Sequence, residues 1–273
     1  MILLAKIYYE RTESRSKFVL KFFEIARIVQ KVKNKSVFIK PNMVSHEAYP
    51  TTTHTETLQI VLEQLQRFAS KIAVGDDPAY DSNFSVSSHP LARVCKSLGF
   101  DFINLLETEM KNINTRSGFS LETSKMMTQF DVIISLPVLK FHKICGMTGA
   151  LKNQFGFLSV EERKCLHFAK TKDINQAIAE LNRIRKPDFF IVDALETMTE
   201  AQESRHGGKC AKIGYMFAGS DPVGLDTFGR KLLHNVDSEH SDEFETGSLD
   251  FVSHINYAIA LGVGDPNVCL QRI

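Results

Sequence analysis

The residue types best suited to chemistry gather in one stretch of the sequence, from Phe130 to Phe157. Lys140, His142 and Lys152 lie there among glycines, and apolar residues separate them. Glycine lets the backbone approach a ligand closely, lysine supplies a cationic donor, and interleaved apolar residues are typical of a lined pocket. The stretch therefore predicts a pocket for a small anion such as a carboxylate or a phosphate.

We predict catalytic roles for His142, Lys152 and Lys140. A histidine titrates near neutral pH and can act as a general acid, a general base or a ligand, and a buried histidine bonded to a carbonyl is the alternative. A lysine beside other cations has a lowered pKa, so it can act as an acid or bind the anion. Gly149 and Asn153 are predicted to bind the substrate, although Asn153 could instead fix a backbone turn.

Further polar residues follow the ends of other predicted strands. In a parallel sheet the carboxyl ends of the strands form the edge where ligands bind, so we expect these residues to converge on the pocket. They are Lys40, Asn42, Asp76, Asp193, Glu196 and Asp221. Thr52 and His54 lie where a predicted helix begins, and a helix N-terminus favours an anionic group. The alternatives are a solvated lysine at Lys40, a turn at Asn42 and a helix cap at Asp221.

The alternation of predicted strands and helices indicates the fold. Strands are expected near residues 3–9, 36–39, 71–74, 101–105, 132–134, 188–192 and 213–218, and helices near 16–33, 58–68, 90–98, 160–168, 174–184, 222–232 and 249–262. This order predicts an α/β fold with a mostly parallel β-sheet and helices on both faces, a three-layer sandwich. The ligand crevice is expected at the C-terminal strand ends. We expect one such domain over residues 1–273, with a small irregular subdomain around 106–129 as an option.

The composition limits the classes of partner that are expected. Of the 273 residues, 43% are hydrophobic and 24% are charged, and the net charge is +1, so nothing draws the whole chain to nucleic acid. No apolar run approaches the roughly 20 residues of a membrane span, and the apolar start of the chain is too short for a signal peptide. We therefore expect a cytoplasmic protein that binds neither nucleic acid nor membrane.

Familiar cofactor motifs are missing from the sequence. The five cysteines form no C-x-x-C pair, which argues against an iron–sulfur cluster or a structural zinc site. No G-x-G-x-x-G follows a predicted strand, so a dinucleotide fingerprint is missing too. His54, His142 and His167 could hold a divalent metal together with nearby carboxylates, but their spacing is not diagnostic.

The sequence LPVLKFHKICGMTGALKNQFGF, residues 136–157, resembles the most distinctive block of the domain of unknown function 362 family. In that family a strand ending in Leu-Pro leads to Lys-x-His, then to Thr-Gly-Ala-Leu-Lys-Asn and a Phe-Gly pair. The resemblance extends over roughly residues 35 to 265. Its other blocks are Lys40 to Asn42, Thr51 to His54, Gly75 with Asp76, Lys164 with His167, Asp193 to Glu196, and Ser220 to Pro222 with Asp226.

The resemblance implies the α/β fold and the site positions above, but no settled reaction. Many members of the family are linked to ferredoxin-like iron–sulfur modules, so it also implies a ferredoxin-like electron-transfer partner. The chain departs from the family pattern after Glu196, where Thr-Met-Thr-Glu stands in place of a glycine-rich turn that contains proline. The substrate or the activity can therefore differ from the family norm.

Two functions remain open. The first is an enzyme that acts on a small carboxylate or phosphate, with Lys40, Lys140 and Lys152 holding the anion and His142 moving a proton. A reductive step with electrons from an iron–sulfur partner is one form of this reaction. The alternative is a non-catalytic ligand-binding or regulatory protein that recognises a metabolite or a ferredoxin-like partner.

Overall fold

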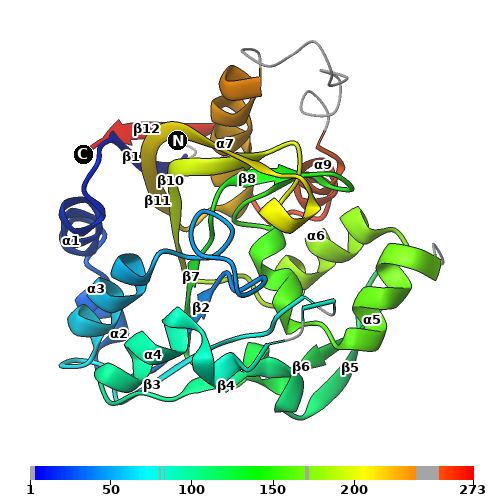
Figure 1. Cartoon of the computed structure of the whole chain (residues 1–273), viewed down its shortest axis with the longest axis horizontal. Coiled ribbons are helices and arrows are strands. Elements are labelled where there is room, and N and C mark those ends of the chain that lie inside the picture. The colour runs from blue at the N-terminus through cyan, green and yellow to red at the C-terminus, as the bar shows by residue number, and fades with distance from the viewer. Residues whose placement is uncertain (1–3, 80, 83, 170–171, 238–251) are drawn as a thin grey trace.

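The computed structural model of the chain describes residues 4–79, 81–82, 84–169, 172–237 and 252–273. Within these ranges an eight-stranded sheet runs through the centre of the molecule (Figure 1). Its strand order is β12-β1-β11-β10-β7-β2-β3-β4. The strands are β1 (Ala5–Arg11), β2 (Ser36–Pro41), β3 (Lys71–Asp76), β4 (Phe102–Asn104), β7 (Val132–Leu136), β10 (Phe189–Thr199), β11 (Lys209–Gly219) and β12 (Val268–Arg272).

The strands of this sheet share one direction except for β11. β11 runs antiparallel to both of its neighbours, β1 and β10, and every other neighbouring pair is parallel. The prediction of a mostly parallel α/β sheet is therefore confirmed. The carboxyl ends of β2, β3, β7 and β10 meet at one edge, and β11 ends at the opposite edge.

Helices cover both faces of the sheet (Figure 1). One face carries α1 (Arg15–Ile25), α2 (Ile28–Val32), α3 (Thr55–Leu65) and α4 (Pro90–Ser97), and the other carries α6 (Ile174–Ile184), α7 (Pro222–Asp237) and α9 (Ser253–Ala260). Neighbouring strand residues point to opposite faces. Val37 and Ile39 accordingly pack into the core under α1 to α4, and Phe38 packs into the core under α6, α7 and α9.

Two short hairpins lie outside the main sheet. β5 (Met110–Asn114) pairs with β6 (Ser120–Ser124) inside the region predicted to be irregular. β8 (Lys140–His142) pairs with β9 (Gly146–Thr148) directly after β7. A 3-10 helix (Lys152–Phe157), helix α5 (Val160–Lys164) and one turn of π-helix (Cys165–Ala169) follow.

Several predicted boundaries differ from the structure. The helix expected over 16–33 is two helices, because Arg27 between α1 and α2 has a φ of 52° in the left-handed region. β10 and β11 are each eleven residues long, since they pair as an antiparallel ribbon from Phe190 opposite Gly219 to Thr199 opposite Lys209. β12 is a strand that the sequence pattern does not indicate. No helix in the described ranges is long and apolar enough to span a bilayer.

Candidate functional site

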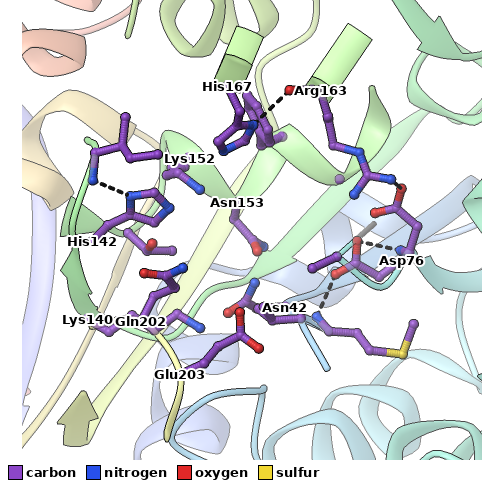
Figure 2. A pocket seen from close by; sticks show the side chains of 18 of the residues that line it. Asn42, Asp76, Lys140, His142, Lys152, Asn153, Arg163, His167, Gln202 and Glu203 are labelled. Carbon is purple, nitrogen blue, oxygen red and sulfur yellow. Dashed lines mark hydrogen bonds and ion pairs between the residues drawn. The ribbon is translucent and has the colours of Figure 1, made fainter. Parts of the chain in front are cut away.

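A cavity of about 400 Å³ lies at the carboxyl ends of β2 and β3, beside the β8–β9 hairpin. This volume lies within the range of roughly 300–1,000 Å³ that is typical of small-molecule sites. In Figure 2, Lys140, His142 and Lys152 lie on one side of the cavity, and Asp76 and Arg163 lie on the other. The cavity therefore occupies the edge where the sequence predicts the ligand crevice.

Eight residues singled out in the sequence line this cavity. They are Lys40, Asn42, Asp76, Lys140, His142, Lys152, Asn153 and His167. The parallel arrangement of β2, β3 and β7 brings them together from segments more than a hundred residues apart. Their convergence at one edge follows from strand direction, as the sequence argument requires.

Lys140 and Lys152 line the cavity without an ion-pair partner in the described ranges, and the exposed Lys143 does so as well. Within the described ranges neither lysine has a carboxylate at ion-pair distance; Lys140 Nζ donates to the carbonyl of Thr51, and Lys152 Nζ lies 5.0 Å from the ring centre of Phe155. Lys140 is 1% exposed, and burial, with the charge of Lys152 adding to it, lowers the pKa of Lys140 to about 7. Burial also lowers the pKa of Lys152. An anion bound here would relieve the cost of both buried charges.

Two ion pairs form the opposite wall. Lys40 Nζ lies 2.5 Å from Asp76 Oδ1, with 1% and 3% of the two side chains exposed. Arg163 lies 2.7 Å from Asp77. Burial raises the pKa of both aspartates, and Asp76 raises that of Asp77 further. Lys40 is thus already neutralised by a partner, whereas Lys140 and Lys152, together with the exposed Lys143, remain available to an anionic ligand.

His142 is buried and neutral. Its Nδ1 accepts the backbone N–H groups of Ile144 and Cys145, both at 3.2 Å, so the proton of the neutral ring sits on Nε2. Burial first, and then the positive charge of Lys152, lower its pKa well below the usual value. The ring can therefore donate a hydrogen bond into the cavity at neutral pH, as neutral imidazoles do in some active sites. His167 also lines the cavity, and burial lowers its pKa.

The turn between β10 and β11 supplies lining residues that the sequence argument missed. Gln202, Glu203 and His206 border the cavity, and the carboxylate of Glu203 accepts Arg205 Nε at 2.6 Å. This turn lies just beyond the segment where the chain departs from the family pattern. Arg163 and Asp77 were missed as well, although Asp77 directly follows Asp76 and Arg163 lies one helical turn before His167.

Asp193 and Glu196, both predicted to bind substrate, lie outside the cavity lining. The Asp193 carboxylate binds Arg15 Nε at 2.6 Å and the Tyr49 hydroxyl at 2.8 Å. Its backbone carbonyl accepts the N–H of Leu139 at 2.9 Å. Asp193 therefore fixes the strand that leads to Lys140, and the Glu196 side chain is exposed on β10.

Thr52 and His54 also lie outside the lining, so the structure does not place the α3 N-terminus in the cavity. His54 Nδ1 accepts the N–H of Glu56 at 3.2 Å and caps α3. Thr52 donates to the carbonyl of Glu47 at 2.9 Å. His54 is thus not grouped with the two other candidate metal ligands, His142 and His167. No cluster of three metal-binding side chains occurs in the part of the chain that the structure describes.

The expectation that Asp221 joins the site is wrong. It rests on a parallel β11, but β11 is antiparallel and ends at the far edge of the sheet. Asp221 instead accepts the N–H groups of Gly224 at 2.9 Å and Asp265 at 3.0 Å. It therefore caps α7, which is the structural alternative that the sequence left open.

Gly149 makes room for a buried carboxylate of the protein, not for the cavity. A Cβ at this position would overlap the carboxylate of Asp226. Asp226, on α7, accepts the N–H groups of Ala150 at 2.6 Å and Leu151 at 3.0 Å, which anchors the turn that leads into Lys152.

Gly149→Ala is therefore expected to lower the free energy of unfolding by about 1–3 kcal/mol, the usual cost of overpacking. Urea denaturation followed by circular dichroism measures this difference. Lys111→Ala, an exposed position on β5, serves as the control and should leave stability unchanged. Equal urea midpoints for the two variants would contradict the close packing of Gly149 against Asp226.

The comparisons with known proteins agree with this fold. The family model described as "Domain of unknown function (DUF362)" matches residues 37–231. The chain belongs to this family. A thylakoid-associated protein from Synechocystis sp. is 28% identical over 201 residues, which cover 70% of this chain and 60% of that protein.

Two solved structures match the structure of this chain. The lactate racemase apoprotein from Thermoanaerobacterium thermosaccharolyticum matches with a TM-score of 0.58 and 16% identity, over 86% of this chain and 58% of that one. A structural genomics target from Thermotoga maritima has a TM-score of 0.49 and 13% identity, over 84% of this chain and 59% of that one. The chain therefore spans about 60% of the length of these relatives. The likeness to the racemase supports the α/β fold.

Proposed function

We propose that this DUF362 protein is an enzyme that acts on a small anionic molecule, a carboxylate or a phosphate. The observation that carries the proposal is the pair of lysines, Lys140 and Lys152, that line the cavity without a carboxylate partner in the described ranges. Ionisable groups with strongly shifted pKa values cluster at functional sites more often than elsewhere. An anion is the ligand that such a pair would bind.

The residues divide into two roles. Lys140 and Lys152 hold the anionic group, and the Nε2–H of neutral His142 donates to an oxygen on which negative charge develops. Such a donor is held in place before the reaction, because Nδ1 is fixed by two backbone N–H groups. The fold neighbour named as a lactate racemase acts on a small carboxylate, which is consistent with this ligand class. The ferredoxin-like partner, and a reductive step that would use it, remain predictions from the family resemblance.

A ligand panel followed by a turnover assay tests the proposal. Small carboxylates and phosphates are first screened for thermal stabilisation of the protein, and each binder is then followed by NMR for conversion. His142→Gln keeps a side chain that can hydrogen-bond, so it should retain binding and lose conversion. Stabilisation without any conversion by the wild-type protein would favour the non-catalytic alternative. Absence of stabilisation by every anion would overturn the proposal.

Anion binding should weaken as pH rises. Lys140, whose pKa burial lowers to about 7, carries its charge below that pH and loses it above. The dissociation constant should therefore rise about tenfold per pH unit between about pH 7 and pH 9, and stay level below about pH 6. Isothermal titration calorimetry measures this profile. Lys140→Met should bind weakly with a flat profile, and a flat profile for the wild type would contradict the assignment.

A further inference from the structure

We infer that the anion is a polyhydroxylated acid, such as a sugar acid or a sugar phosphate, and this inference rests on the proposed function. Three side-chain carbonyl oxygens at the cavity are buried and have no hydrogen-bond donor among the described residues: Asn42 Oδ1, Asn153 Oδ1 and Gln202 Oε1. A buried acceptor without a donor is costly, and native proteins contain few of them. Three at one cavity indicate a ligand that brings the donors.

The orientation of Asn153 is fixed by the protein. Its Nδ2 donates to Ser135 Oγ at 2.8 Å and to the carbonyl of Lys40 at 3.2 Å. These two bonds use both donors of the amide NH₂ group, and Asn153 is only 2% exposed. The carbonyl oxygen is therefore the end of this side chain that remains for a ligand.

Asn42 is held by its backbone. Its N–H donates to Thr53 Oγ1 at 2.7 Å, and its carbonyl accepts the N–H of Thr53 at 2.9 Å. These bonds leave the side-chain amide unused, and Oδ1 is buried at the cavity. The two bonds to Thr53 hold the Asn42 backbone at the cavity, directly after β2.

Gln202 lies on the turn between β10 and β11, next to a carboxylate that is already satisfied. Glu203 is paired with Arg205, and its backbone carbonyl accepts the N–H of Gly208 at 2.9 Å. The neighbouring Gln202 Oε1 has no such partner in the part of the chain that the structure describes. In Figure 2, Asn42 and Asn153 lie between the lysine side of the cavity and the Asp76 side, and Gln202 lies on the lysine side, beside Lys140 and His142.

The lysines and the amides of the cavity would bind different ends of one ligand. An amide carbonyl oxygen repels a carboxylate or phosphate oxygen and accepts from a hydroxyl, whereas a lysine binds the anionic oxygen. The anionic end is therefore expected at Lys140 and Lys152, and the hydroxylated body at the three amides. A site built to hydrogen-bond hydroxyl groups rejects the analogue that lacks them, because its own polar groups are then left unpaired.

Three six-carbon probes and inorganic phosphate separate these contributions by isothermal titration calorimetry. Gluconate carries the anion and the hydroxyls, hexanoate the anion alone, and glucose the hydroxyls alone. Gluconate should bind at least about 30-fold more tightly than hexanoate and glucose, since each buried hydrogen bond is worth about tenfold. If hexanoate or phosphate binds as tightly as gluconate, the inference fails and the proposed function stands. If no anion binds, both fail.

Variants of the amide residues test whether they cause the preference for gluconate over hexanoate. Gln202→Met removes one acceptor at nearly constant volume and should reduce the preference of the protein for gluconate over hexanoate about tenfold. Gln129→Met makes the same change at an exposed residue outside the cavity and should leave the preference unchanged. Asn42→Leu should have the same effect as Gln202→Met. An unchanged preference in both cavity variants would overturn the inference.

Discussion

Replacing Lys152 with methionine is expected to weaken anion binding by about 30-fold or more, the usual cost of removing one member of a buried charge pair. Methionine keeps most of the length of the side chain and removes the charge. Lys152 has no carboxylate at ion-pair distance in the described ranges, so a bound anion would be its nearest negative charge. Calorimetric titration of wild type and variant with the best-binding anion measures the loss.

Lys21→Met is the matched control for this prediction. Lys21 is exposed on α1 and lies outside the cavity lining. Since exposed charges contribute little, its loss should change affinity no more than about threefold. Equal losses in the two variants would mean that the protein attracts anions through its overall charge, with no specific role for Lys152.

Replacing Lys40 with methionine is expected to destabilise the fold by about 3–5 kcal/mol, because removal of one partner leaves the other as an uncompensated buried charge. The Asp76 carboxylate, 3% exposed, would lose a partner at 2.5 Å and keep only the N–H groups of Met43 at 2.6 Å and Asp77 at 2.8 Å. Urea denaturation monitored by circular dichroism measures the change.

The double variant with Asp76→Leu provides the internal test. Removing both charges leaves no buried ion, so the double variant should be more stable than Lys40→Met alone. Lys212→Met, which breaks an exposed pair with Glu13, is the surface control and should have no measurable effect. A Lys40→Met protein as stable as the wild type would contradict the burial of the pair.

Strand direction decides how much of the site can be predicted from sequence. Lys40 and Asp76 each end a parallel strand, so the alternation of strands and helices is sufficient to place them at one edge. The prediction that places Asp221 at this edge fails because β11 is antiparallel. The sequence pattern identifies only short apolar cores for β10 and β11, which suggests a long connection between them. Their polar extensions form the ribbon that reverses the chain, and those residues lack the apolar signal that marks a strand.

The differences between the predicted and the observed site have a common cause, which is contact between segments that are distant in the sequence. Gln202 lies on the turn of that ribbon, so its position at the cavity depends on how far β10 and β11 pair. Asp193 follows a predicted strand, but its carboxylate turns to Arg15, a partner 178 residues away in the sequence. Long-range pairs of this kind carry no periodic signal. The residues of the central block are the exception, because chemistry and local sequence coincide at Lys140, His142 and Lys152.

A crystal structure of the protein soaked with gluconate tests the assigned anion site most directly. We expect the carboxylate of gluconate within hydrogen-bond distance of Lys140 Nζ and Lys152 Nζ, with hydroxyl groups on the amides of Asn42 and Asn153. Gluconate bound elsewhere on the molecule, or bound with its carboxylate turned away from both lysines, would contradict the assignment of Lys140 and Lys152 to the anion.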